Sequence, residues 1–344
     1  MLLRAIRIHE HGGYEKLLMQ EVAIRTVRPD EARVRIHAAG LNHLDLWVRR
    51  GIPGVRYPLP LTPGCDGAGV LLEVGETVKG FKRGDRVVLA PGVSCGACEA
   101  CFDGRDNLCR EYGILGEHRD GTCAEEIVVP GRNLIRIPEG LSFEQAAAVP
   151  LVFLTAWQMV VDKAKVVPGE WVVVLGAGSG VGSAAVQIAL LYGARVIAVS
   201  GSEDKLEKAR ALGAEEGINL SRSDLKDEVK RITTRRGADV VIEHVGKATF
   251  EQSLLCLAWG GRLVSCGATT GAEVALNLRH LFFKNLSVLG STMGSRARFG
   301  PIFRHVEAGR LKPMVDRVLP LAQVAEAHRL LEERRVFGKI ILTP

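Results

Sequence analysis

The chain has 344 residues, of which 47% are apolar and 24% are charged, so it is long enough for about two domains with proper cores. Its 45 basic and 39 acidic residues are interspersed, and the net charge of +6 therefore gives no reason to expect nucleic-acid or membrane partners. The mild basic excess fits an enzyme that acts on small anionic ligands. The opening "MLLRAIRIHEHGGYEK" carries charges where a signal peptide needs an apolar core, so we expect a cytoplasmic protein.

Residues 1 to about 150 contain short β-branched runs that are broken by glycine and proline. Examples are "EARVRIHAAG", "AGVLLEVGETV" and "AEEIVVP". Short strands with turn signals at this spacing predict a compact, mostly-β unit, either a barrel or a sandwich.

Four cysteines interrupt this region in "PGVSCGACEACFDGRDNLC", separated by two, two and seven residues. The spacing is typical of a metal site, and disulfides are the weaker alternative in a reducing compartment. Four thiolates fill all tetrahedral positions of one Zn²⁺, so the predicted site of Cys95, Cys98, Cys101 and Cys109 is structural. We expect one zinc per chain, which orders a lobe over residues 91–113, and the alternative is an apo or oxidised cluster.

From about residue 151 onwards, continuous apolar runs alternate with helical periods. "WVVVL", "ARVIAVS" and "ADVVIEHVG" are typical of strands buried on both faces, and "SEDKLEKARALGA" is typical of a helix between them. This alternation predicts an α/β fold class with a doubly wound parallel sheet after the mostly-β unit. The last fifty residues add a helix and the strand "GKIILTP", which could belong to either unit.

The stretch "WVVVLGAGSGVGSAAVQIA" is predicted to be a strand, a glycine-rich turn and a helix. The glycines allow a pyrophosphate to approach closely, and the helix start offers free N–H groups and the positive end of its dipole. The predicted dinucleotide contacts in this stretch are Gly176, Gly178, Gly180, Val181 and Gly182.

The end of the next strand selects between the two nicotinamide cofactors. An acidic residue there usually holds a free ribose 2′-hydroxyl, whereas a 2′-phosphate needs a cation nearby. The sequence has Ser200 at that place, Lys205 in the following helix and Arg222 at the next turn, which favours NADP. Glu203 and Asp204 are also close, and NAD therefore stays the alternative.

Together these stretches resemble the medium-chain dehydrogenase/reductase superfamily, which includes zinc alcohol dehydrogenases and quinone oxidoreductases. The resemblance covers nearly the whole chain and is carried by "AAGLNHLDLWVRRG", "PGCDGAGVLLEVGETVKGFKRGDRV", the four-cysteine loop, "GAGSGVGSAAVQIA" and "FGKIIL". It implies a GroES-like catalytic domain made of residues 1–152 together with 293–344, and a Rossmann dinucleotide-binding domain over 153–292.

In the zinc alcohol dehydrogenases, a Cys, a His and a distal Cys or Asp hold a catalytic metal. The resemblance puts Asn42, Cys65 and Leu151 at these three positions, and one of them keeps a residue that binds zinc well. We therefore expect no catalytic zinc. A substitute site built from Cys65, Asp66 and His43 is the alternative.

The candidate catalytic residues are Asn42, His43, Asp45, Cys65 and Asp66. Asn42 matches an Asn of the metal-free reductases and could donate to the substrate oxygen, or it could simply cap a helix. Asp45 is expected to orient its neighbours, and His43 either reaches the cofactor phosphates or faces solvent. The further cofactor contacts that the resemblance implies are Thr155, His244, Val245, Gly246, Gly267, Gly338 and Lys339.

These residues predict an NAD(P)H-dependent reductase of activated C=C bonds or quinones that works without a catalytic zinc. One alternative is an NAD(P)-dependent alcohol or aldehyde dehydrogenase whose metal site is non-standard or absent. Another is a cofactor-binding structural protein, like the lens crystallins of this superfamily. The resemblance, together with the apolar stretch "FFKNLSVLGSTMG", implies a homodimer or a homotetramer.

Overall fold

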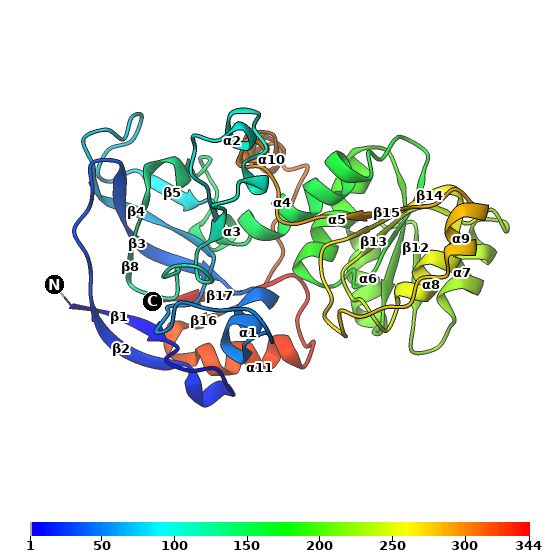
Figure 1. Cartoon of the computed structure of the whole chain (residues 1–344), viewed down its shortest axis with the longest axis horizontal. Helices are drawn as coiled ribbons and strands as arrows, with labels where there is room; N and C mark the ends of the chain where they lie inside the picture. Colours follow the sequence, from blue (N-terminus) through cyan, green and yellow to red (C-terminus); the bar gives the residue numbers. More distant parts are fainter. Residues whose placement is uncertain (1) are drawn as a thin grey trace. The chain divides into compact units, whose positions relative to one another are not determined.

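The computed structural model describes residues 2–344, and the chain divides into two compact units. Unit 1 comprises Met1–Leu151, Ser295–Glu307 and Pro313–Pro344, and unit 2 comprises Val152–Gly294 and Ala308–Lys312. The colours of Figure 1 show the C-terminal strands and helix among the N-terminal elements of unit 1. The division expected from the sequence differs from this one mainly in the short segment 308–312, which packs with unit 2.

Unit 1 is built around a seven-stranded sheet in the order β16-β17-β3-β4-β5-β9, with β8 also paired to β3. Its strands are β3 (Glu31–Gly40), β4 (Asp66–Val74), β5 (Arg86–Leu89), β8 (Glu126–Pro130), β9 (Leu134–Arg136), β16 (Val315–Pro320) and β17 (Lys339–Thr343). Two further pairs are β1 (Leu2–Arg7) with β2 (Leu18–Ala23), and β6 (Gly92–Val93) with β7 (Gly113–Ile114). The mostly-β unit predicted from the sequence is thus present.

The register of β17 against β3 matters most for the site. Ile341 pairs with Gly40 and Leu342 pairs with Ala39, in antiparallel fashion. The start of β17 therefore lies beside the end of β3, although some 300 residues separate them in sequence. The helices of unit 1 are α1 (His43–Arg50), α2 (Glu99–Phe102), α3 (Phe143–Ala147), α10 (Phe299–Glu307) and α11 (Val324–Glu332).

Unit 2 is a six-stranded sheet in the order β12-β11-β10-β13-β14-β15, and every neighbouring pair is parallel. Its strands are β10 (Trp171–Val174), β11 (Arg195–Ser200), β12 (Glu216–Asn219), β13 (Ala238–Glu243), β14 (Leu257–Ser265) and β15 (Ser287–Gly290). The side chains of Val172, Val173 and Val174 are fully buried, as a continuous apolar run predicts.

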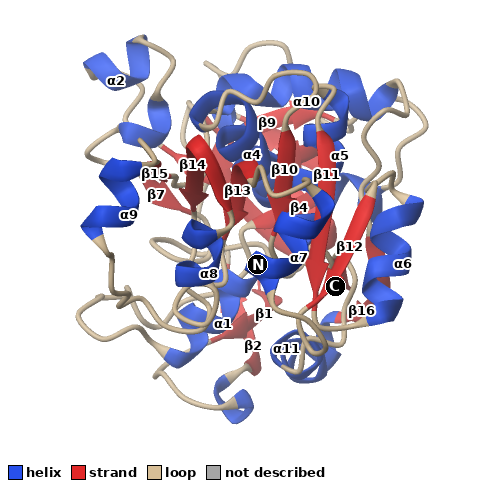
Figure 2. Ribbon diagram, turned by 90° about the vertical axis from the view of Figure 1, so that its right-hand side faces the viewer, coloured by secondary structure: helices blue, strands red, loops and turns tan. Residues whose placement is uncertain are grey.

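The helices of unit 2 cover both faces of this sheet. They are α4 (Pro150–Trp157), which begins at the end of unit 1, α5 (Gly180–Leu191), α6 (Glu203–Ala211), α7 (Leu225–Ile232), α8 (Phe250–Leu255) and α9 (Leu278–Phe283). Helices α5 and α6 lie on one face, with α7 and α8 on the other (Figures 1 and 2). The predicted doubly wound parallel sheet is confirmed. Within the described residues, none of the helices has the length and apolar character needed to cross a membrane.

Candidate functional site

The first group of predicted site residues meets in unit 1, where β3 ends and β4 and β17 begin. Asn42 directly precedes α1, and Cys65 directly precedes β4. Asp66 is the first residue of β4, and Lys339 is the first residue of β17. The exposed fractions of Asn42, Cys65, Asp66 and Lys339 are 4%, 0%, 0% and 3%. We call these four residues the lysine cluster.

The lysine cluster is held together by hydrogen bonds around one ion pair. Lys339 Nζ donates to Asn42 Oδ1 at 2.5 Å and to Asp66 Oδ2 at 3.0 Å. Asn42 Nδ2 donates to Asp66 Oδ2 at 2.9 Å and lies 3.1 Å from Cys65 Sγ. The other carboxylate oxygen, Asp66 Oδ1, accepts from the backbone N–H of Leu151 at 2.9 Å. Of the three positions that the resemblance assigns to metal ligands, residues 42 and 151 are thus joined through the carboxylate of Asp66, and residue 65 contacts the amide of Asn42.

Asp45 fixes the two backbone segments that carry the lysine cluster. Its carboxylate accepts from the N–H of Asn42 at 2.7 Å and from the N–H of Gly64 at 2.8 Å. Burial raises the pKa of Asp45 to about 6, against the lowering effect of these two N–H donors and of Lys339. Asp45 thus ties the start of α1 to the backbone that precedes β4, and its orienting role stays a prediction.

His43 and Cys65 differ in their surroundings. His43 is the first residue of α1, and its ring meets that of Trp47 edge-on at 5.4 Å. Cys65 is fully buried, and burial with the nearby Asp66 charge raises the pKa of its thiol well above the usual value. Across residues 2–344, the one group of three or more His, Cys, Asp or Glu side chains with converging ligand atoms is the four-cysteine group. His43, Cys65 and Asp66 therefore do not form a ready-made metal site.

The four cysteines of the predicted lobe converge as the spacing requires, with all four sulfur atoms within 4.8 Å of one another. The Sγ atoms of Cys95 and Cys101 are 3.9 Å apart, those of Cys98 and Cys101 3.6 Å, and those of Cys109 and Cys95 3.5 Å. Tetrahedral Zn²⁺ with bonds of ~2.3 Å would place its sulfurs ~3.8 Å apart. The donor set and its spacing therefore fit a closed tetrahedral zinc site.

In unit 2 the glycine-rich turn joins β10 to α5. The hydroxyl of Ser179, the N-cap of α5, accepts from the N–H of Gly182 at 2.9 Å. A Cβ on Gly176 would lie 2.8 Å from His244 Nε2, and one on Gly178 would lie 2.7 Å from Lys205 Cδ. Side chains at these positions would collide with His244 and Lys205, so glycine lets the turn pack closely before α5, whose free N–H groups suit a dinucleotide pyrophosphate. Gly180 and Val181 are the first two residues of α5.

At the end of β11 the chain carries no acid. Ser200 is buried, and its hydroxyl accepts from the N–H of Ser202 at 3.3 Å. The nearest acid, Glu203, is bonded to Arg210 at 3.1 Å and accepts from Asn219 at 3.3 Å. These bonds lower the pKa of Glu203, and the charge of Arg222 lowers it further. Glu203 is thus engaged with α6 and β12.

The strand end of β13 is organised by Glu243, a residue that the sequence analysis missed. This fully buried carboxylate accepts from the N–H groups of Val245 and Gly246 at 2.7 and 3.1 Å, and from two hydroxyls, Thr249 Oγ1 and Ser253 Oγ, at 2.9 and 2.6 Å. An acid closing an otherwise apolar strand, "ADVVIEHVG", is the signal that could have revealed it.

The carbonyl groups after β13 are also engaged. Val245 O accepts from the N–H and the hydroxyl of Thr270, both at 2.8 Å, and His244 O accepts from Thr269 Oγ1 at 3.1 Å. His244 Nε2 lies 3.2 Å from Ser179 Oγ, and burial lowers the pKa of the imidazole. The structure thus brings His244 directly against the glycine-rich turn.

The other predicted cofactor contacts lie at three separate places. A Cβ on Gly267, after β14, would meet His244 O at 3.1 Å, which places Gly267 beside the end of β13. Thr155 is buried in α4 of unit 2. Gly338 precedes β17 with φ +86°, and a Cβ there would meet Met314 O at 2.3 Å. Gly338 therefore has a structural requirement of its own.

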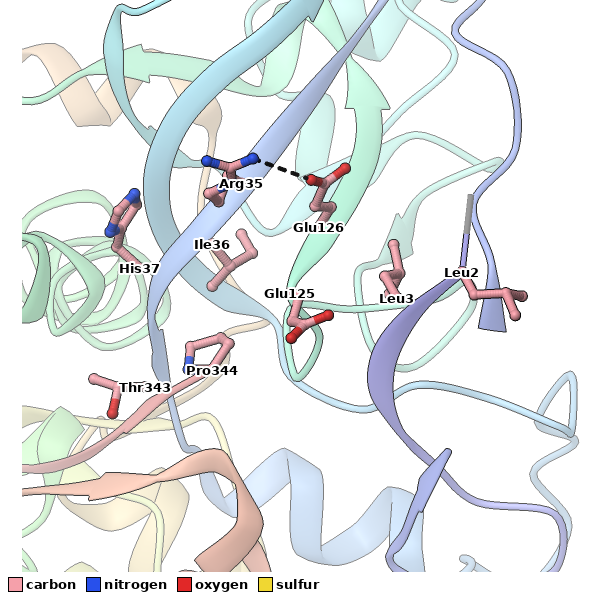
Figure 3. A pocket seen from close by; sticks show the side chains of 9 residues that line it. All are labelled: Leu2, Leu3, Arg35, Ile36, His37, Glu125, Glu126, Thr343 and Pro344. Carbon is pink, nitrogen blue, oxygen red and sulfur yellow. Dashed lines mark ion pairs between the residues drawn. The ribbon is translucent and has the colours of Figure 1, made fainter. Parts of the chain in front are cut away.

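A separate cavity of about 600 Å³ lies in unit 1 (Figure 3). Its lining combines the two ends of the chain with charged side chains, and Arg35 lies 3.7 Å from Glu126. The lining residues are Leu2, Leu3, Arg35, Ile36, His37, Glu125, Glu126, Thr343 and Pro344. None of the site residues predicted from the sequence is among them.

Comparisons with known proteins agree with this geometry. Residues 28–139 match the family model of the alcohol dehydrogenase GroES-like domain, and residues 180–308 match that of the zinc-binding dehydrogenases. A zinc-type alcohol dehydrogenase-like protein of Schizosaccharomyces pombe is 34% identical, with 99% of each chain covered. Human quinone oxidoreductase is 31% identical over 99% of this chain and 98% of its own.

Among solved structures, a protein described as an NAD-dependent alcohol dehydrogenase has a TM-score of 0.96 and 54% identity, with 99% of each chain covered. The GroES-like unit and the parallel sheet predicted from the sequence are therefore both confirmed. The chain belongs to the medium-chain dehydrogenase/reductase superfamily and is an NAD(P)-dependent oxidoreductase.

Proposed function

We propose that this oxidoreductase transfers a hydride from NAD(P)H to an activated C=C bond or a quinone, without a catalytic zinc. The observation that carries the proposal is the lysine cluster. The ammonium of Lys339 is bonded to the side-chain oxygens of both Asn42 and Asp66. A divalent cation placed among these atoms would meet a fixed positive charge and would lack two of the family's three ligands.

The proposed substrate class follows from a site that offers an ammonium in place of a metal ion. An unactivated alcohol must lose its hydroxyl proton as hydride leaves, and a metal makes this feasible by stabilising the alkoxide. When bound, the reduced nicotinamide supplies a hydride to the carbon β to a carbonyl. The charge then spreads into an enolate, which hydrogen-bond donors and a proton from water suffice to neutralise. In the proposal unit 1 is the catalytic domain, and Asp45 orients the hydrogen-bond donors of the lysine cluster.

We propose NADP as the cofactor, held by unit 2. The strand end at Ser200 offers no acid for a free 2′-hydroxyl, and Glu203 is already engaged by Arg210 and Asn219. In the proposal, Lys205 and Arg222 are the cations that bind the 2′-phosphate. The turn from Gly176 to Gly182 lines the pyrophosphate site, together with His244. The second candidate is NAD, which the description of the 54% identical structure favours.

The test for the cofactor compares kcat/KM for NADPH and NADH in the wild type and in Arg222→Gln. We expect the wild type to prefer NADPH, and the substitution to reduce kcat/KM for NADPH about tenfold while leaving NADH nearly unchanged. An equal loss for both cofactors, or a wild-type preference for NADH, would show that the 2′-phosphate is not recognised here.

For the four cysteines we propose one structural Zn²⁺ per chain. Four thiolates leave no open position, so this metal would order the lobe over residues 91–113 and would take no part in hydride transfer. Metal analysis of the purified protein should give one zinc per chain, and two zincs would contradict the proposed zinc-free reaction.

We also propose that two copies assemble through the edge strand β15. Among residues 2–344, β15 has a strand neighbour on one side only, and Leu278, Phe282 and Phe283 of the preceding helix α9 are each more than 60% exposed. A second copy would extend the sheet and cover these side chains. Sedimentation should show at least a dimer, and Val288→Lys on β15 should dissociate it. The matched control is Val318→Lys on the edge strand β16 of unit 1, which should not.

The function itself is tested by an assay series with one preparation. NADPH and NADH oxidation is followed with a quinone, a short enone and an aldehyde, and NAD(P) reduction is followed with a primary alcohol. We expect turnover with the enone or the quinone that persists in the presence of a chelator. Alcohol-dependent reduction of NAD that the chelator abolishes, while the fold stays intact, would favour the second candidate, an NAD-dependent alcohol dehydrogenase. The 54% identical structure gives that candidate its support.

A further inference from the structure

The ammonium of Lys339 has one N–H more than the lysine cluster uses. An ammonium carries three N–H donors, and two of them are taken by Asn42 Oδ1 and Asp66 Oδ2. Across residues 2–344 the third has no acceptor, although Lys339 is 97% buried (3% exposed). Burying a charged donor without a full set of partners is costly, so an unused buried N–H calls for an explanation, and a ligand that accepts from it is one.

Asn42, by contrast, has no donor left to offer. Its Oδ1 must face Lys339, because the amide NH₂ group in that place would meet an ammonium. Its Nδ2 is then directed to Asp66 Oδ2 at 2.9 Å, Cys65 Sγ at 3.1 Å and the carbonyl of Gly40 at 3.2 Å, which is more than two hydrogens can serve. Asn42 therefore cannot donate the hydrogen bond to the substrate that the sequence suggests, and Lys339 is the neighbouring side chain that still can.

The backbone holds Lys339 in this position before any ligand arrives. Gly338 turns the chain at φ +86°, and the N–H of Lys339 bonds to Met314 O at 2.8 Å. The aliphatic stem passes over Gly40, where a Cβ would come within 3.3 Å of Lys339 Cε. Because both the backbone and the stem of Lys339 are held in place, its ammonium needs no reorganisation when charge develops on a ligand.

We propose that the third N–H of Lys339 is the hydrogen-bond donor to the substrate oxygen that becomes negative during hydride transfer. This inference rests on the proposed function, and it defines the substrate class as conjugated ketones, aldehydes and quinones. The electron pair of the C=C bond forms the enolate, whose oxygen accepts from Lys339 Nζ. A water proton then completes the α-carbon, and Lys339 keeps its own proton throughout. Lys339 thus has a catalytic role in place of the cofactor contact that the resemblance implies.

The test uses the double variant Lys339→Met/Asp66→Asn, because removing Lys339 alone would leave a buried unpaired carboxylate. With the best enone, we expect kcat to fall about 100-fold, the scale of losing one oxyanion donor, while the Kd for NADPH stays within about threefold. Lys339→Arg keeps the charge and should retain a measurable part of kcat. Asp66→Asn alone keeps the donor and should lose less than the double variant.

A spectroscopic measurement separates this role from a structural one. The visible band of 4-(dimethylamino)cinnamaldehyde moves to longer wavelength when its oxygen accepts from a cation. With oxidised cofactor present, we expect this shift in the wild type and in Lys339→Arg, and its loss in the double variant. Thermal melting confirms that each variant is folded.

Three outcomes would overturn the proposal: an unchanged kcat in a folded double variant, a tenfold higher Kd for NADPH with kcat retained, or an aldehyde band that does not depend on Lys339. Failure of the proposed function is a different result, in which the wild type reduces no enone or quinone with either cofactor. In that case the aldehyde band still reports whether Lys339 binds a carbonyl oxygen.

Discussion

The four-cysteine group and the lysine cluster are both compact polar groups in unit 1, yet they satisfy their charges in opposite ways. The cysteine group brings together four identical soft donors and contains no cation of its own. The lysine cluster has two oxygen acceptors, one thiol and a built-in ammonium, and all its members are at most 4% exposed. A set of like donors suits an external cation, whereas an ammonium within a set repels one, and the proposed zinc contents of the two groups follow from this difference.

The largest effect should come from breaking the cysteine group. Cys101→Ser replaces a thiolate with a poor zinc ligand, so zinc should fall from one per chain to near zero. The free energy of unfolding should fall by on the order of 5 kcal/mol, the upper range for single substitutions, because the lobe loses its cross-link. Metal analysis and urea denaturation measure the two effects. Cys266→Ser in unit 2 is the control, and equal zinc loss there would contradict a local site.

The second effect comes from breaking the ion pair of the lysine cluster. Asp66→Asn leaves Lys339 buried without a countercharge and should destabilise the protein by about 3–5 kcal/mol in urea denaturation. Adding Lys339→Met removes the stranded charge and should restore part of this loss. Zinc content should stay at one per chain in both variants. A double variant that is as unstable as the sum of its single changes would show that the two side chains do not interact.

The third prediction uses pH to separate the cysteine group from Asp45, which bonds the backbone segments that carry the lysine cluster. The folded pKa of Asp45 is about 6, above its unfolded value of 3.8, so the folded state binds the proton more tightly between these values. Its contribution to stability is therefore fully present below about pH 4 and is lost as pH rises to about 6. A difference of about 2 pKa units corresponds to about 3 kcal/mol.

Zinc binding should show the opposite trend, because acid protonates thiolates and releases the metal. The Asp45 effect is thus measured most clearly in the zinc-depleted Cys101→Ser background, from unfolding midpoints between pH 4 and 7. Asp45→Asn should remove the decline in stability with rising pH. If the decline persists in Asp45→Asn, another group is responsible for it.

The two groups also differ in how far the sequence could predict them. The cysteine group depends on local spacing, so residues 95, 98, 101 and 109 could be identified directly, and the parallel sheet followed from runs such as "WVVVL". The lysine cluster depends on the register of β17 against β3, which joins positions 42 and 339. No local pattern encodes that register. The sequence therefore could not show that Lys339 lies against Asn42 and Asp66, or that the amide of Asn42 is already engaged. Glu243 is different, because its partners lie within ten residues of it and the acid that closes an apolar strand is a local signal.

The smallest effect should come from crowding the lysine cluster without changing its charges. In Gly40→Ala the new Cβ would lie 2.5 Å from Ala147 O and 3.3 Å from Lys339 Cε. The overpacking should cost about 1–3 kcal/mol, and the shift of Lys339 should lower kcat more than it raises KM. Gly300→Ala in α10 is the matched control, because its nearest neighbour is a flexible arginine end at 3.7 Å. That substitution should stabilise the helix by about 0.5–1 kcal/mol. Equal behaviour of the two variants would mean that the ammonium needs no such tight placement, whereas a selective loss in Gly40→Ala would show that β3 positions the charge that β17 supplies.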